Sequence, residues 1–131
     1  HPDHGKGADV VRSAVFLSGL PKVRTEVDGN RQQAHRPDVV LNYIQFNPLT
    51  PSIVIPFDDE IMELKMRAVE AFSSQFYDPD SKEPETVISS KNFLDSVRYR
   101  AADMGRMVRA PYGEGFVSES LLKVDNLNDL T

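Results

Sequence analysis

Two histidines at the start of the chain are the residues whose type and spacing could do chemistry. His1 and His4 stand three positions apart, with Asp3 between them and Pro2 restricting the backbone. A neutral imidazole is a good zinc ligand, and a catalytic zinc takes three protein ligands and keeps one position for water. His35 is the remaining histidine and no His-Glu-x-x-His spacing occurs, so a zinc site complete within these 131 residues is not expected. Taken alone, the pair fits a solvated loop as well as a metal site.

Two charged residues could bind a substrate. Glu114 stands between Gly113 and Gly115, and glycine allows a backbone to approach a ligand closely. Arg36, which precedes Pro37, could bind a carboxylate through its planar guanidinium. Because Glu and Arg side chains are mostly exposed, a turn carboxylate and a surface arginine are the plainer interpretations. Cysteine is absent and no Gly-x-Ser-x-Gly motif occurs, which argues against a cysteine or serine nucleophile.

Net charge and hydrophobic patterning limit the classes of partner that the protein is expected to bind. A net charge of -5 argues against nucleic-acid binding, because affinity for a phosphate backbone is carried largely by Lys and Arg. No stretch approaches the roughly 20 apolar residues that a spanning helix needs. We therefore expect a cytoplasmic protein, with no nucleic acid and no membrane as partner.

The first third of the chain predicts one helix and one loop. A helix is expected over 5–18, directly after His4, and Gly19 supplies its C-terminal stop. The polar segment 22–37 is predicted to be a loop, with a turn at 28–30.

The rest predicts strands and helices in alternation. Strands are expected over 39–46 and 53–55, and Pro56 closes the second one. Asp58 is expected to cap a helix. Its buried face is predicted to contain Ile61, Leu64, Ala68 and Phe72.

A last helix should follow the polar loop at 77–84. Ser89 or Ser90 would cap it and Pro111 would end it. The buried stripe of this last helix is expected to contain Phe93, Val97, Ala101, Met104 and Val108. After the helix, segment 112–117 is predicted to be a glycine-flanked loop that enters a short strand. Interleaved helices and strands favour an α/β fold, with helices packed on a small mixed sheet.

Several motifs, in order, resemble one family. They are His1-Pro2-Asp3-His4, Phe16-Leu17-Ser18-Gly19-Leu20, His35-Arg36-Pro37, Asn42-Tyr43, Lys65 with Ala68, Ser74-Gln75-Phe76, and Tyr112-Gly113-Glu114-Gly115-Phe116. Together they resemble the second half of LmbE-like (PIG-L-type) zinc-dependent N-deacetylases, and most closely the bacillithiol-pathway branch that deacetylates N-acetylglucosaminyl malate. The resemblance implies that residues 1–131 are the C-terminal part of a single Rossmann-like deacetylase domain. The family's Ala-His-Pro-Asp-Asp-like segment, which provides two zinc ligands and the base, does not occur in this sequence.

The resemblance also implies roles for five residues. His4 would be a zinc ligand, and His1 would stabilise the tetrahedral intermediate or protonate the leaving amine. Asp3 could orient a neighbouring imidazole. Arg36 and Glu114 would line the substrate cleft, with Arg36 the better candidate for an anionic aglycone such as malate.

Two other functions remain open. One is a non-catalytic binding or oligomerisation module with the same fold, and the other is a zinc amidase for a different amino sugar. Relatives of this kind are often homo-oligomers, so we expect one here by analogy. A family tyrosine near the site is replaced by Phe93, so no hydroxyl is expected from that position.

Overall fold

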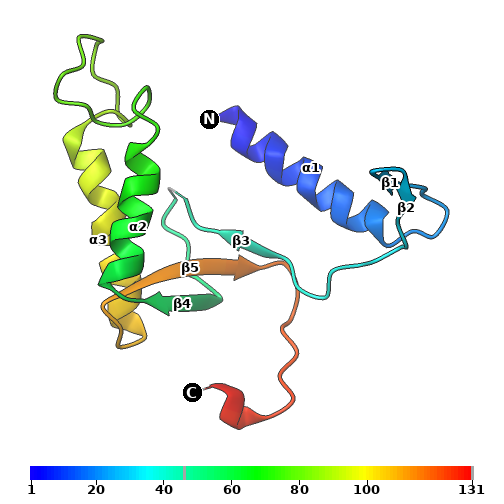
Figure 1. The fold of residues 1–131 in the computed structure, drawn as a ribbon. Helices are drawn as coiled ribbons and strands as arrows, with labels where there is room; N and C mark the ends of the chain where they lie inside the picture. The colour runs from blue at the N-terminus through cyan, green and yellow to red at the C-terminus, as the bar shows by residue number, and fades with distance from the viewer. Residues whose placement is uncertain (46, 131) are drawn as a thin grey trace. The chain divides into compact units, whose positions relative to one another are not determined.

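The computed structural model describes residues 1–45 and 47–130, which form two compact units, 1–40 and 41–131. The described residues have an α/β fold with small antiparallel sheets (Figure 1). The sequence led us to expect one part of a single domain. The elements in order are α1 (Pro2–Ser18), β1 (Glu26–Val27), β2 (Asn30–Arg31), β3 (Leu41–Tyr43), β4 (Ile53–Phe57), α2 (Asp59–Glu70), α3 (Lys91–Met107), β5 (Tyr112–Ser118) and the short 3-10 helix η1 (Leu127–Leu130).

The first unit begins with α1, which starts earlier than the sequence predicted. Its first residue is Pro2 and its N-cap is His1, so the His1–His4 motif is the first helical turn and not a loop before it. Proline is favoured at this position because its fixed φ suits a helix and its missing N–H would have no partner there. Gly19 is the C-cap, as expected, and its N–H donates to the carbonyl of Leu17.

A short hairpin follows α1, where the sequence predicted only a loop with a turn. β1 and β2 pair in antiparallel register, with Glu26 opposite Arg31. Asp28 and Gly29 form the turn with φ of 51° and 75°, the left-handed conformation that two-residue hairpins require. The turn prediction is thus confirmed, whereas the two-residue strands were too short for their alternation to be detected.

The second unit is built on a three-stranded sheet in the order β3-β5-β4. β5 is central and antiparallel to both neighbours, with Phe116 opposite Tyr43 on one side and Ile53 on the other. The mixed sheet that we expected is therefore wrong for the described residues. After β4 the chain goes up through α2 and returns down through α3, and this brings β5 back in the opposite direction (Figure 1).

The strand limits differ from the predictions in three places. β3 is shorter than the predicted strand over 39–46, of which residue 46 lies outside the described residues. β4 continues through Pro56 to Phe57, which is possible because β4 is an edge strand and one side of its backbone needs no ladder hydrogen bond. β5 includes all of 112–117, where a loop was expected to precede the strand.

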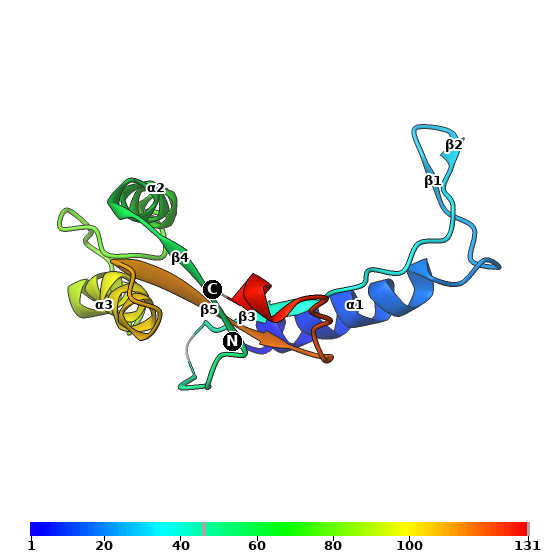
Figure 2. The same cartoon turned by 90° about the horizontal axis from the view of Figure 1, so that it is seen from below.

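The two helices of this unit lie side by side in both views (Figures 1 and 2). Asp58 caps α2 by accepting from the N–H of Ile61, and Ser90 caps α3 by accepting from the N–H of Phe93, both as predicted. α3 ends at Met107, four residues before Pro111. The core between them contains Met62, Met66, Leu94, Val97 and Ala101, with Phe57, Val69, Tyr77 and Tyr112 packed around it.

The buried face of α2 is not the predicted one. Met62 is fully buried, whereas Ile61, Leu64 and Phe72 are 48%, 53% and 59% exposed, and Ala68 is exposed as well. The helix carries two apolar faces, and the one with Met62 and Met66 faces α3. A count of apolar spacing cannot distinguish two such faces, because both follow the helical period.

The stripe predicted for α3 is correct at its centre. Val97 and Ala101 are buried, Phe93 and Met104 are half-buried, and Val108 is exposed beyond the helix. Leu94 and Gly105 complete the buried face.

Among the described residues, none of the helices has the length and apolar composition that a membrane-spanning helix needs.

Candidate functional site

The first turn of α1 brings His1 and Asp3 together. His1 Nδ1 lies 3.3 Å from the backbone nitrogen of Asp3 and 3.3 Å from Asp3 Oδ2. These two contacts use the same ring atom in different states. A neutral Nδ1 accepts from the backbone N–H, whereas a protonated Nδ1 donates to the carboxylate. The pair can therefore hold the His1 ring in place before and after a proton arrives.

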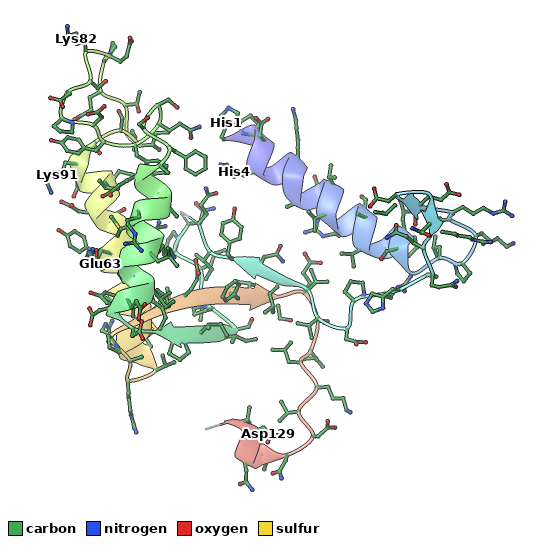
Figure 3. The ribbon with its side chains drawn as sticks, viewed as in Figure 1. His1, His4, Glu63, Lys82, Lys91 and Asp129 are labelled. Carbon is green, nitrogen blue, oxygen red and sulfur yellow. The ribbon has the colours of Figure 1, made fainter. Side chains whose placement is uncertain are left out.

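His4 follows in the same turn, and its imidazole is exposed at the N-terminal end of α1 (Figure 3). Its backbone N–H donates to the carbonyl of His1 at 3.1 Å. Helical spacing of three residues puts the two side chains on neighbouring parts of the helix surface. His1, Asp3 and His4 thus lie within the cap and first turn of α1.

His35 and Arg36 lie at the other end of the same helix. The N–H of His35 donates to the carbonyl of Ser18 at 2.9 Å. Arg36 Nη2 donates to the carbonyl of Phe16 at 3.3 Å, and the guanidinium carbon lies 5.3 Å from the centre of the Phe16 ring. Arg36 also covers Gly19, where a Cβ would lie 2.5 Å from Arg36 Nε. These contacts cap and cover the C-terminal end of α1.

The two ends of α1 are too far apart to share a small ligand. At 1.5 Å per residue, His4 and Phe16 are separated by about 18 Å along the axis. A substrate held at His4 would have to span that distance to reach Arg36 of the same chain. Among residues 1–45 and 47–130, no three His, Cys, Asp or Glu side chains gather to hold a metal ion.

Glu114 occupies a defined position in the second unit. Glu114 Oε1 accepts a hydrogen bond from Lys65 Nζ of α2 at 2.8 Å, and these side chains are 39% and 31% exposed. The Lys65 ammonium also lies 5.8 Å from the centre of the Phe57 ring. The interpretation of Glu114 as a solvated turn carboxylate is wrong, because the residue is in β5 and its charge is paired.

Close packing of glycines fixes the backbone on both sides of Glu114. A Cβ on Gly105 of α3 would lie 2.5 Å from the Cα of Tyr112, and a Cβ on Gly113 would lie 2.6 Å from Val54 Cγ1. At Gly115 a Cβ would meet Pro51 Cβ at 3.1 Å and Met104 Sδ at 3.2 Å. The glycines that flank Glu114 thus serve contact between α3 and the sheet, and this holds the Glu114 side chain at one place.

Glu114 and Lys65 line a pocket of about 270 Å³ within the second unit. Its walls come from α2, α3, β5 and the end of β3. Most of the lining is apolar, including Val69, Phe76 and Phe93. Arg100 is also in the lining, and no sequence motif singles it out. The Lys65–Glu114 contact could not be predicted either, because the two residues are 49 positions apart in the sequence and only the fold brings them together.

The two residues with shifted pKa values, Lys91 and Arg98, do not line this pocket. A hydrogen bond with Asp95 raises the pKa of Lys91 above its ordinary value. Hydrogen bonds with Tyr112, and then Glu63, raise the pKa of Arg98. Both are lysine or arginine cations stabilised by a neighbour, so neither supplies a group that would exchange protons near neutral pH.

No family model matches the sequence. The structure is similar to the crystal structure of the conserved protein TT1542 from Thermus thermophilus, with a TM-score of 0.72 and 24% identity. The match covers 95% of this chain and 49% of that chain. The two share an α/β fold. This chain thus spans about half the length of TT1542, and at this identity the likeness concerns the fold alone.

Proposed function

We propose that the chain is the C-terminal part of a zinc-dependent N-deacetylase of the LmbE-like superfamily. Within a longer polypeptide it would hydrolyse the acetamide of an N-acetylglucosaminide such as N-acetylglucosaminyl malate. The observation that carries the proposal is the exposed first turn of α1, in which His1, Asp3 and His4 lie together. The match to half of a longer chain is compatible with a domain of which this sequence is one part.

The residues present fit a zinc site in part. An exposed His4 imidazole can serve as one ligand. The other ligands would come from outside the described residues, within which no group of three metal-binding side chains occurs. When bound in such a site, zinc polarises the amide carbonyl and lowers the pKa of a water molecule.

His1 would act on charge that develops during the reaction. A protonated His1 ring beside the acetyl group would stabilise negative charge on the carbonyl oxygen or give its proton to the departing amine. Asp3, 3.3 Å from His1 Nδ1, would hold that ring in its orientation. This assigns Asp3 a positioning role, and His1 the contact with the substrate.

Arg36 and Glu114 are the proposed substrate-binding residues. The position of Arg36 at the C-terminal end of α1 and the contact of Glu114 with Lys65 limit how each can bind a substrate. Arg36 can contact a ligand bound at His4 of the same chain only if that ligand spans about 18 Å. Within the described part of the chain, Glu114 Oε1 accepts from Lys65, and Oε2 can accept from a hydroxyl or amide of a ligand.

A non-catalytic assembly module is the second candidate. It is favoured by the apolar side chains that α1 leaves at the surface, among them Val10 at 68% and Phe16 at 59% exposure. A homo-oligomer could cover such residues, as could another part of a longer chain. A zinc amidase for a different amino sugar would share the His4 site and differ only in the cleft.

The test is zinc content and acetate release by the full-length gene product. N-acetylglucosaminyl malate would be assayed beside plain N-acetylglucosamine, with His4→Ala as the test variant and His35→Ala as its matched control. We expect bound zinc and acetate release that His4→Ala abolishes and His35→Ala retains. A metal-free and inactive full-length protein would instead favour the assembly module, and activity without a malate preference would favour the other amidase.

A further inference from the structure

The pocket of the second unit has the size of a single-ring ligand. Its volume of about 270 Å³ lies just below the range of about 300–1,000 Å³ typical of drug-sized ligand sites. Phe76 and Phe93 form one wall, with ring centres 6.2 Å apart and planes inclined at 34°. Such a pair can contact a third ring by its face or its edge. Gly113 and Gly115 of β5 also belong to the lining.

The charges in the lining favour an anion. Lys65, Arg100 and Glu114 are the charged residues among those that line the pocket. Lys65 and Glu114 neutralise each other at 2.8 Å, whereas Arg100 forms no ion pair within the described part of the chain. One positive charge thus remains at a mainly apolar pocket. A guanidinium binds a carboxylate through two parallel hydrogen bonds, which are stronger than those between neutral groups.

We propose that this pocket binds a small carboxylic acid that carries one six-membered ring. The ring packs against Phe76 and Phe93, and the carboxylate pairs with Arg100. An aromatic acid and a sugar acid both offer this combination, since a pyranose also has an apolar face. The pocket shares Glu114 with the substrate-binding residues of the proposed deacetylase. Binding in it needs no zinc site, because every lining residue belongs to the second unit and His4 does not.

The binding test uses the full chain, labelled with ¹⁵N, in the presence of EDTA. 3-Phenylpropionate and D-glucuronate are titrated separately, with the neutral 3-phenylpropanamide as the matched probe. The amide signals of Gly113 and Gly115 report on the pocket. Arg100→Gln removes the proposed anion contact, and Arg67→Gln makes the same charge change at an exposed position of α2 outside the lining.

We expect at least one of the two acids to saturate the Gly113 and Gly115 signals with one site per chain. Its affinity should fall about 10-fold or more in Arg100→Gln and stay within about twofold in Arg67→Gln and in His4→Ala. 3-Phenylpropionate as the tighter ligand would identify an aromatic acid, and D-glucuronate a sugar acid that also uses Glu114. The proposal is wrong if neither acid binds, if Arg100→Gln and Arg67→Gln have equal effects, or if the neutral amide binds as well as the acid.

Discussion

Lys65 Nζ in α2 lies 2.8 Å from Glu114 Oε1 in β5, and this ion pair joins the helical layer to the central strand. Both side chains are about one-third exposed, so solvent weakens the pair without removing it. Lys65→Met and Glu114→Gln should each lower the free energy of unfolding by about 0.5–1 kcal/mol. A double-mutant cycle by urea unfolding should give a coupling energy of about 0.5 kcal/mol or more.

The matched control for this cycle is the Lys91–Asp95 pair on the surface of α3. Its atoms are 2.7 Å apart, but the Lys91 side chain is 65% exposed and the pair spans a single helical turn. We expect its coupling energy to be smaller, because solvent screens this exposed pair more strongly. Equal coupling in the two cycles would show that Lys65 and Glu114 are held no better than a surface pair.

Gly105→Ala should destabilise the second unit by about 2–3 kcal/mol. The added Cβ would lie 2.5–2.6 Å from backbone atoms of Tyr112, and a backbone cannot rotate away as a side chain can. The same substitution at Gly7, in α1, meets nothing within 4 Å. There it should stabilise the helix by up to about 1 kcal/mol, because alanine loses less backbone entropy than glycine. Thermal unfolding followed by far-UV circular dichroism should show opposite changes in stability for the two variants, a loss for Gly105→Ala and a gain for Gly7→Ala.

Met62→Ala should cost about 3 kcal/mol, because Met62 is fully buried in the core of the second unit. Ile61→Ala, at a residue that is 48% exposed, should cost less than about 1 kcal/mol. Urea unfolding of the two variants tests which face of α2 is buried. If Ile61→Ala were the more costly change, the face predicted from apolar spacing would be the true one.

Local chemistry made parts of the fold predictable from sequence. Asp58 and Ser90 cap helices through their own side chains, and the Asp28-Gly29 turn depends on two adjacent residues. The His1–Asp3 contact is of the same kind, because it lies within one helical turn. Such features need no knowledge of the rest of the chain.

Contacts between segments that are distant in the sequence could not be predicted from local sequence patterns. The choice between Met62 and Ile61 as the buried residue of α2 depends on where α3 packs. The pairing of Glu114 depends on how β5 returns to the sheet, and the contact of Arg36 with Phe16 depends on how the hairpin segment folds back. In each case several partners satisfy the local pattern, and only the tertiary structure selects one.

The pKa of Lys91 should lie above its ordinary value of 10.5, because Asp95 accepts a hydrogen bond from it and attracts its charge. A raised pKa in the folded state stabilises the fold below the unfolded pKa, and this contribution is lost as pH rises through the folded value. Asp95→Asn should return the pKa of Lys91 toward 10.5 and remove this alkaline dependence. NMR titration of the Lys91 ε-protons measures the shift, and an unchanged midpoint in the variant would contradict it.

Arg36→Met should loosen the C-terminal end of α1. No basic residue lies in the last turn of this helix, and Arg36 supplies a cation that donates to the carbonyl of Phe16, one of the last carbonyls without a helical partner. Loss of one such hydrogen bond, about 1 kcal/mol, should speed amide hydrogen exchange about fivefold at Leu20, whose N–H donates to Leu17. Arg31→Met, on the exposed hairpin strand β2, is the charge-matched control and should leave Leu20 unchanged. Equal acceleration in both variants would mean that net charge, and not the contact with Phe16, stabilises this helix end.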